Sequence, residues 1–333
     1  MSAPLWISEA EVVALMDMAG AIAALDRGLA LEAGGGAQNM VKTHALWDGH
    51  NTLHAIGATV PGAGFVGTKT WAHTEGGATP LLILFDSHDG SLKAVIEAFA
   101  LGQLRTGGIS GVATRVLAAP EADDMALIGT GKQAITQLAA VAAVRKLRRV
   151  RVFGRDAERR AAFVARVRRT LDLPAAEAAS IEAAVAGASI VTLVTRATTP
   201  FLTAAMVTRG AHINAVGAIT PERAEFAPDL LARCGVVAAD NVTQVRNLSR
   251  EFQEHYGADE AAWSTVAPLS ALVAAGKARP ASADLTMFKA MGMGISDLSL
   301  GIEIYRAASA RSLGKKLPTP ERATPRLKPA APM

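Results

Sequence analysis

The spacing of apolar residues changes several times along this 333-residue chain and predicts its elements. After Ser8-Glu-Ala-Glu11, which has the form of a capping box, apolar residues recur at helical spacing as far as Gly34 and predict two helices. From Met40 they instead form short runs separated by Gly, Pro and Asp, which predict an antiparallel sheet of about five strands. These strands are expected at residues 41–46, 52–58, 65–72, 81–86 and 92–96.

The rest of the chain alternates between strands and helices. Strands are expected at residues 125–128, 150–154, 189–195, 211–216 and 236–239. Helices are expected at 132–146, 180–188 and 267–275 and near 228–233, and a basic helix that ends at 171 is expected after the second strand. This alternation predicts an α/β fold with a doubly wound parallel sheet. A helix at 97–118 precedes this region and a last helix, at about 295–312, follows it. The basic, Pro-rich end of the chain predicts a mobile tail.

A glycine turn joins the first of these parallel strands to its helix in Met125-Ala-Leu-Ile-Gly-Thr-Gly-Lys-Gln-Ala134, the G-x-G-x-x-A form of the dinucleotide fingerprint. Gly129 permits the tight turn, and Ala134 keeps helix and strand close. Gly131 lets a pyrophosphate approach the N–H groups at the helix start. The next strand, from Val150, arrives at the spacing of a βαβ unit, so the motif predicts a dinucleotide site.

Gly154-Arg155-Asp156 follows the second strand and bears on which dinucleotide is bound. Sites for NAD usually place a carboxylate at this strand end to bind the ribose 2′-hydroxyl, whereas an arginine nearby accommodates the 2′-phosphate of NADP. Glycine at 154 and arginine at 155 therefore favour NADP(H). Asp156 keeps NAD(H) open, because it could either cap the next helix or bind the ribose.

Composition and charge exclude several classes of protein. The net charge is +4, with basic clusters at residues 145–151, 155–169 and 306–328, but only 5% of residues are aromatic and no nucleic-acid module is recognisable. We therefore interpret the clusters as solvated helix faces and expect no nucleic-acid partner. No signal peptide or membrane span is predicted, and Cys234, the only cysteine, permits no internal disulfide, so we expect a cytoplasmic protein.

Two basic residues are candidates for chemistry. Lys69 shares a strand face with Gly67 and Trp71, surroundings that can lower the pKa of an ammonium and suit it to donate a proton; the alternative is an exposed strand lysine. Arg105 opens a part of its helix that is rich in small residues, which suggests close approach by another backbone or a ligand. Its guanidinium could clamp a carboxylate or phosphate, or could lie on the surface.

Histidines offer little further chemistry. His73 lies on the same strand face as Lys69 and is the one histidine that we consider as an acid. His50 and His54 have the H-x-x-x-H spacing, but they span a turn and a strand start where a zinc pair needs a helix, so we expect no metal.

Several motifs together resemble the ornithine cyclodeaminase/mu-crystallin family from about Ile7 to Ala308. The motifs are Gly67-Thr-Lys-Thr70, Leu104-Arg-Thr-Gly107, Gly129-Thr-Gly-Lys-Gln-Ala134, Gly210-Ala-His-Ile-Asn-Ala-Val-Gly217 and Phe288-Lys-Ala-Met-Gly-Met293. The resemblance implies a Rossmann domain at 119–283 and a substrate-binding and dimerisation domain formed by 1–118 with 284–312, leaving 313–333 as the tail. It also implies a homodimer paired through the N-terminal sheet.

The same resemblance implies roles for individual residues. Lys69 resembles the family's active-site lysine, and Asp297 a late acidic residue lining the cleft between the domains. Arg105 resembles an arginine that binds the substrate carboxylate or sits by the cofactor. Lys42, expected on the first strand, falls where many members have a carboxylate-binding arginine. His73 is expected to contact the substrate as well, because of its place on the Lys69 strand face and not because of the resemblance. The expected cofactor contacts are Arg105, Thr106, Gly129, Thr130, Gly131, Lys132, Gln133, Arg155, Thr195, Val216 and Gly217.

One departure from the family pattern affects the expected reaction. Cyclodeaminases carry an aspartate just after the Val-Gly-Gly/Ala turn, and Ile219, which stands there, cannot exchange a proton. We therefore expect NAD(P)H-dependent reduction of the C=N bond of a small imino acid or ketimine, or the reverse amino-acid dehydrogenase reaction. The alternatives are an ornithine or lysine cyclodeaminase and a non-catalytic NADPH-dependent binding protein.

Overall fold

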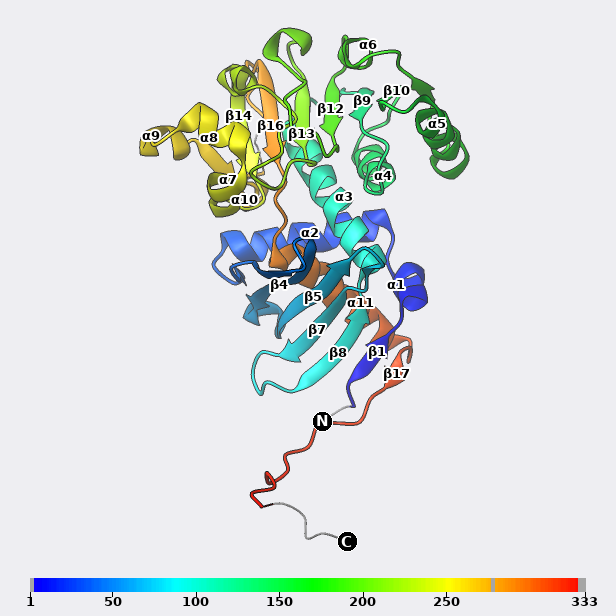
Figure 1. Ribbon diagram of the computed structural model, residues 1–333, viewed down its shortest axis with the longest axis vertical. Coiled ribbons are helices and arrows are strands. Elements are labelled where there is room, and N and C mark those ends of the chain that lie inside the picture. Colours follow the sequence, from blue (N-terminus) through cyan, green and yellow to red (C-terminus); the bar gives the residue numbers. More distant parts are fainter. Residues whose placement is uncertain (1–2, 277–278, 329–333) are drawn as a thin grey trace.

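The computed structural model describes residues 3–276 and 279–328, which form two sheets with helices packed on both (Figure 1). The first sheet has nine strands in the described part of the chain. Across it lie, in order, β17 (Lys315–Lys316), β1 (Leu5–Ile7), β8 (Leu92–Glu97), β7 (Leu81–Asp86), β5 (Phe65–Thr74), β4 (Asn51–Val60) and β2 (Gln38–Asn39), with β3 (Thr43–Trp47) also paired to β4 and β6 (Gly77–Ala78) to β5.

This first sheet differs from the prediction at its edge. The five expected strands are present, but β1 adds a parallel pairing with β8, so the sheet is mixed. Lys315 and Lys316, which were expected in the tail, pair antiparallel with β1, so the tail prediction was wrong at its start. The physical reason is that β1 leaves a row of unpaired N–H and C=O groups at its edge, which β17 covers.

Four helices accompany the first sheet, α1 (Glu9–Leu15), α2 (Met18–Ala33), α3 (Phe99–Leu117) and α11 (Gly294–Ala310). The predicted capping box is confirmed, because Ser8 and Glu11 bond reciprocally at the start of α1. The last helix, α11, returns to pack on β4, β5 and β7. A Cβ on Gly301 would lie 2.1 Å from Leu82, which shows how closely this helix approaches the sheet.

The second sheet is parallel throughout. Its order is β11 (Ala175–Glu177), β10 (Arg149–Phe153), β9 (Asp124–Ile128), β12 (Ile190–Leu193), β13 (His212–Ala215), β16 (Leu285–Lys289), β14 (Cys234–Ala239) and β15 (Val266–Pro268). The order reverses between β9 and β12, and ligands of such sheets bind outside the carboxyl ends of the strands at that switch point.

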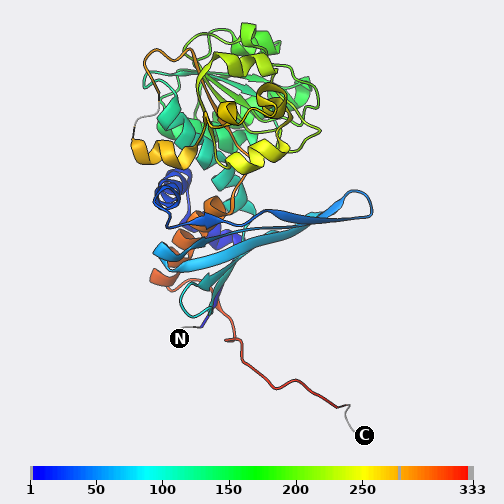
Figure 2. The same cartoon turned by 90° about the vertical axis from the view of Figure 1, so that its left-hand side faces the viewer.

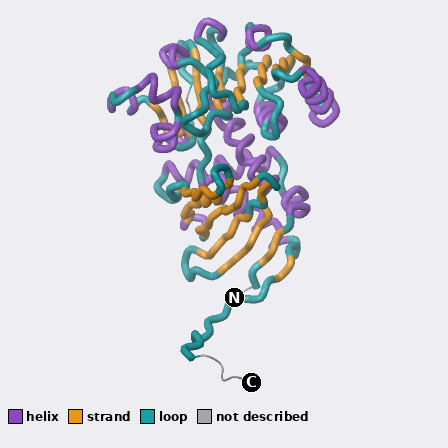
Figure 3. Tube along the Cα trace, in the orientation of Figure 1, coloured by secondary structure: helices purple, strands orange, loops and turns teal. Residues whose placement is uncertain are grey.

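Helices cover both faces of this sheet, as the colouring of Figure 3 also shows. They are α4 (Ala134–Val144), α5 (Ala157–Leu171), α6 (Ile181–Val185), α7 (Val242–Leu248), α8 (Arg250–Tyr256), α9 (Glu260–Trp263) and α10 (Leu269–Ala275), with a 3-10 turn at Pro228–Arg233. Ala126 and Ile128 of β9 belong to one apolar cluster, whereas Met125 and Leu127 belong to another. A strand buried on both faces is what the doubly wound prediction requires.

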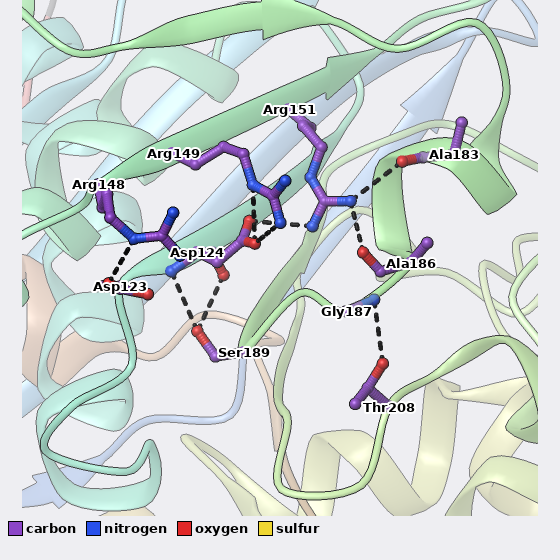
Figure 4. A network of polar contacts seen from close by, with 10 residues as sticks. All are labelled: Asp123, Asp124, Arg148, Arg149, Arg151, Ala183, Ala186, Gly187, Ser189 and Thr208. Atoms are coloured by element: carbon purple, nitrogen blue, oxygen red, sulfur yellow. Dashed lines mark hydrogen bonds and ion pairs between the residues drawn. The ribbon is translucent and has the colours of Figure 1, made fainter.

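The basic residues at the amino ends of these strands are paired, as Figure 4 shows. Arg151 Nη2 lies 2.9 Å from Asp124 Oδ1, and Arg149 Nε donates a 2.9 Å hydrogen bond to Oδ2 of the same carboxylate. Arg148 pairs with Asp123 at 2.9 Å. The prediction that the cluster at 145–151 is a solvated helix face was therefore wrong for these arginines, which lie beside or on β10 and are neutralised by neighbouring carboxylates.

Candidate active site

Three side chains from distant parts of the chain meet between the two sheets. Lys69 on β5 donates a hydrogen bond to Oδ1 of Asp297, in the first turn of α11. Arg105 on α3 places its Nε 3.3 Å from the same oxygen. Lys69 is 4% exposed and Asp297 is fully buried, so the alternative of an exposed strand lysine was wrong. The side chain of Arg105 is 17% exposed, so it is not a surface arginine either.

The surroundings of Lys69 change its acidity in the predicted direction. Its Nζ lies 5.2 Å from the centroid of the Trp71 ring. Burial lowers the pKa of the Lys69 ammonium to about 8, and the charge of Asp297 limits that fall. The result is an ammonium that is protonated at neutral pH and can release a proton more readily than an ordinary lysine.

Asp297 has spare capacity as an acceptor. Its Oδ2 is buried and has no hydrogen-bond partner among the described residues. Buried carboxylate oxygens are normally paired, because leaving one unpaired costs about 1–3 kcal/mol or more. An unpaired oxygen beside Lys69 and Arg105 can accept a hydrogen bond from a bound molecule that carries an N–H group.

Arg105 is held against the segment that connects β16 to α11. Gly292 has a φ of +86°, and a Cβ there would lie only 2.9 Å from Arg105 Nη1. The adjoining backbone is fixed by the buried Asp240, whose carboxylate accepts hydrogen bonds of 2.8 Å from the N–H groups of Met291 and Gly292. Burial raises the pKa of Asp240, while these N–H donors and Arg105 oppose the rise.

The two other predicted substrate residues are placed differently. Lys42 precedes β3 and does not lie on it, so its expected strand position was wrong; the pairing with β4 begins at Thr43. Burial lowers the pKa of Lys42, and the charge of Arg105 adds to that effect, so Lys42 lies within electrostatic reach of the site. His73 is exposed near the end of β5, and the structure gives it no hydrogen bond or ion pair with Lys69 or Asp297.

The glycine turn of the fingerprint lies at the switch point, directly after β9. Gly129 has a φ of +120°, and a Cβ there would lie 2.6 Å from the carbonyl oxygen of Val194, so only glycine fits. The Cβ position of Gly131 has nothing within 4 Å, which leaves open space over the turn. Helix α4 begins at Ala134 and not at Lys132 as predicted, because residues 130–133 form an irregular turn closed by Ala134 N–H on Gly131 O.

The small residues of α3 are explained by the approach of α4. A Cβ on Gly107 would lie 2.6 Å from Thr136 O, and one on Gly111 would lie 3.0 Å from Ala140 O. The carbonyl of Thr106 also accepts a 2.9 Å hydrogen bond from Gln137 Nε2. Close backbone approach, one of the two expectations for this segment, is therefore confirmed.

The remaining predicted cofactor residues surround this turn. The side chain of Thr130 lies against Gly154, where a Cβ would be 3.0 Å from it, and Gln133 accepts a hydrogen bond from Thr136. Lys132 and Arg155 are exposed. Asp156 caps α5, because its carboxylate accepts a 3.0 Å hydrogen bond from the N–H of Arg159.

A buried acidic residue that the sequence interpretation missed organises the opposite side of the switch point. Oε1 of Glu225 accepts hydrogen bonds from N–H and Oγ1 of Thr195 at 2.6 and 2.8 Å, and Oε2 accepts from the N–H of Gly217 at 2.7 Å. Lys289 Nζ donates to Ala218 O at 2.7 Å. The signal in the sequence was Lys289, a lone lysine in an apolar strand, whereas Glu225 stands among Glu222, Arg223 and Asp229 and gave none; both residues are fully buried in the fold.

The described ranges contain neither a metal centre nor a membrane span. Across residues 3–276 and 279–328 no cluster of His, Cys, Asp and Glu could hold a metal ion. His50 lies 3.4 Å from Glu75, whereas His54 bonds to Thr52, so the two histidine side chains have different partners and do not face one common point. In the same ranges no helix combines the length and the apolar character needed to span a bilayer.

Comparison with known proteins supports the family resemblance that the motifs suggested. The sequence profile of the ornithine cyclodeaminase/mu-crystallin family matches residues 4–312. A Delta(1)-pyrroline-2-carboxylate reductase of Bacillus cereus is 30% identical over 240 residues, covering 71% of this chain and 73% of the relative. The ketimine reductase mu-crystallin of Mus musculus is 31% identical over 230 residues, or 69% of each chain.

The fold is shared with solved structures. The Thermococcus litoralis Delta(1)-pyrroline-2-carboxylate reductase, solved in complex with NADH and L-proline, matches with a TM-score of 0.87 at 23% identity, covering 94% of this chain and all of that one. This likeness establishes that the two chains share a fold.

Proposed function

Because this chain belongs to the ornithine cyclodeaminase/mu-crystallin family, we propose that it reduces the C=N bond of a small α-imino acid with NAD(P)H. The observation that carries the proposal is the buried Lys69 ammonium beside Asp297, in a chain whose relatives include a pyrroline-2-carboxylate reductase and a ketimine reductase. The reverse reaction, oxidation of an amino acid to the imine, uses the same groups.

The residues at the switch point fit a dinucleotide. Gly131 leaves open space above the turn, and Gly129 and Gly217 each hold a backbone position where a Cβ would clash. Thr106, Thr130, Lys132, Gln133, Thr195 and Val216 are the further contacts that we assign to it. The bound nicotinamide would supply the hydride that the imine carbon accepts.

We assign the remaining chemistry to the chain's own residues. Lys69 donates a proton to the imine nitrogen, which makes the carbon a better hydride acceptor and yields the amine after hydride addition; solvent then returns the proton to Lys69. Asp297 keeps Lys69 charged, and its unpaired Oδ2 accepts from the substrate N–H. Arg105 and Lys42 neutralise the substrate carboxylate. His73, exposed at the end of β5, lines the outer part of the same site.

The 2′-phosphate of NADP(H) would be bound by Arg155. Its position is exposed at the end of β10, and Asp156 is engaged in capping α5, which removes the carboxylate expected of an NAD site. Arg155→Ala is expected to lower kcat/KM for NADPH about tenfold or more and to leave NADH nearly unaffected. Arg166→Ala, at an exposed position inside α5, the helix that follows Arg155, is the control. A higher kcat/KM with NADH than with NADPH for the unaltered protein would favour NAD(H) instead, and equal values would refute the preference for NADP(H).

The residue at one position, Ile219, argues against cyclodeamination. Ile219 packs against the apolar cluster that contains Phe226 and Phe252, so its place offers no proton acceptor. The decisive experiment follows NADPH oxidation with pyrroline-2-carboxylate, piperideine-2-carboxylate, iminosuccinate, and pyruvate with ammonia or methylamine. Turnover of any imine supports reduction. Proline and ammonia from ornithine would establish the cyclodeaminase, and tight NADPH binding without any turnover would establish a binding protein.

A homodimer completes the proposal. The β3–β4 hairpin projects beyond the body of the protein (Figure 2), and Trp47 and Leu53, on the side opposite to Lys69, are 38% and 49% exposed. Large apolar side chains that stay exposed on one face are typical of an interaction surface, so a partner copy covering this face would bury them. Leu53→Asp is expected to shift the molar mass in light scattering from dimer to monomer. A monomer before substitution would refute the dimer. The expected cytoplasmic location stays a prediction.

A further inference from the structure

A row of stacked rings extends from Lys69 along the outer part of the first sheet. Trp71 and His54 stack with centroids 4.7 Å apart and planes at 17°, and His54 stacks on His44 at 5.7 Å and 29°. These residues are cross-strand partners on β5, β4 and β3, so their side chains share the face that carries Lys69. We call Trp71, His54 and His44 the ring stack.

The ring stack is not part of the apolar core. Trp71 and His54 are half-buried and His44 is exposed, and none of the three belongs to a core cluster. Nδ1 of His54 is buried without a hydrogen-bond partner among the described residues, while Nε2 is bonded to Thr52 Oγ1 at 2.8 Å. Burial, followed by the charge of Lys42, lowers the pKa of His54 to about 4, so the imidazole is neutral at neutral pH.

Charge distinguishes the ring stack from the adjoining catalytic groups. Lys42, Lys69 and Arg105 exceed the carboxylates of Asp240 and Asp297 by one positive charge, and the charges of Arg105 and Asp297 both bear on the pKa values of the two lysines. One excess positive charge matches one substrate carboxylate. The ring stack itself contains no carboxylate, lysine or arginine side chain.

We infer that the ring stack is the subsite for the substrate's side chain and that this side chain is an uncharged aromatic ring. The inference rests on the proposed function and narrows it to aryl-substituted 2-imino monocarboxylates. A ring that continues the stack gains aromatic contact beyond its buried area, and the unpaired His54 Nδ1 offers one hydrogen bond to a polar ring atom. A second carboxylate gains no stacking contact, and an ammonium would add a further positive charge beside Lys42, Lys69 and Arg105.

The test compares imines formed with methylamine from phenylpyruvate, pyruvate and oxaloacetate. The phenylpyruvate imine is expected to show a kcat/KM at least about tenfold above that of the pyruvate imine, since stacking and ring burial add. Trp71→Leu should reduce this ratio about tenfold, and Trp71→Phe, which keeps a ring, should retain most of it. Phe99→Leu, an exposed ring outside the stack, is the control and should leave the ratio unchanged.

The possible failures are distinguishable. Imine reduction without preference for the aryl substrate, a preference for the oxaloacetate imine, or a Trp71→Leu ratio equal to that of Phe99→Leu overturns the subsite and leaves the proposed function intact. Absence of turnover with every imine removes the proposed function. Calorimetric binding of phenylalanine and alanine in the presence of NADPH then decides the subsite: tighter phenylalanine binding that Trp71→Leu abolishes supports it, and equal binding overturns it.

Discussion

Replacing Lys69 with methionine tests the central chemical assignment. The substitution keeps an unbranched side chain of similar reach and removes the ammonium. Asp297 then loses its main cation, although Arg105 Nε remains 3.3 Å from Oδ1. Both an activity effect and a stability effect follow, and the design has to separate them.

The activity effect is the loss of a general acid, which is worth about 10²–10⁴-fold in kcat/KM. The stability effect comes from leaving a buried charge without its partner, which typically costs about 3–5 kcal/mol. We expect the lower end of that range, because Arg105 stays beside the carboxylate. Adding Asp297→Asn to the variant removes the unpaired charge, so the double variant should regain free energy of unfolding without regaining turnover.

The assay follows loss of reduced-nicotinamide absorbance with the best imine of the panel, together with denaturant unfolding and NADPH binding. Binding of NADPH should remain near that of the unaltered protein in both variants, which shows that the nucleotide turn is intact. Full imine-reducing turnover by Lys69→Met with unchanged NADPH affinity would refute the role of the ammonium. Recovery of turnover in the double variant would show that folding, and not proton transfer, had been lost.

Three further predictions concern the same site. Above pH 8 the Lys69 ammonium loses its proton, so reductive kcat/KM should fall with rising pH through about 8 and amino-acid oxidation should rise through the same value; a flat pair of profiles contradicts the assignment. Glu225→Gln replaces an acceptor oxygen that faces N–H donors, so the KM for NADPH should rise about tenfold, whereas the exposed Glu222→Gln changes nothing. Gly292→Ala should raise the KM for the imine by disturbing the guanidinium beside it. Gly90→Ala, at a similar positive φ with open space, should cost only stability, and equal KM values in the two variants would exclude this explanation.

The spacing of apolar residues predicted the long helices and strands correctly, but it did not predict strands of two or three residues. Helix α3 and strands β5, β7 and β8 lie within a few residues of their predicted bounds. Strand β1 has three residues and β17 has two, too few to show alternation, and their pairing joins the two ends of the described chain. Three short helices between residues 242 and 263 likewise lack a repeated apolar spacing.

The sequence suggested individual residues of the candidate site, but not how the fold arranges them. Lys69 and Arg105 stood out because of their unusual neighbours, whereas Asp297 came only from the family resemblance. Lys69 and Asp297 are 228 positions apart in the sequence, and no local sequence pattern predicts that their strand and helix lie side by side. Glu225 was missed because an acidic residue in a loop is ordinarily solvated, and its burial appears only when the loops after β12 and β13 converge on it.

Two rigid connections link the proposed catalytic groups to the proposed nucleotide-binding turn. Arg105 lies on α3, whose backbone approaches α4 so closely at Gly107 that no Cβ fits, and α4 itself begins at the end of the glycine turn. Asp240, at the carboxyl end of β14, holds the Gly292 segment that leads into α11 and so to Asp297. A displacement of about 1 Å at a reacting carbon can cost a hundredfold in rate. Helix packing and backbone hydrogen bonds, which deform little, therefore fix the separation between the proposed nicotinamide site and the proposed proton donor, Lys69.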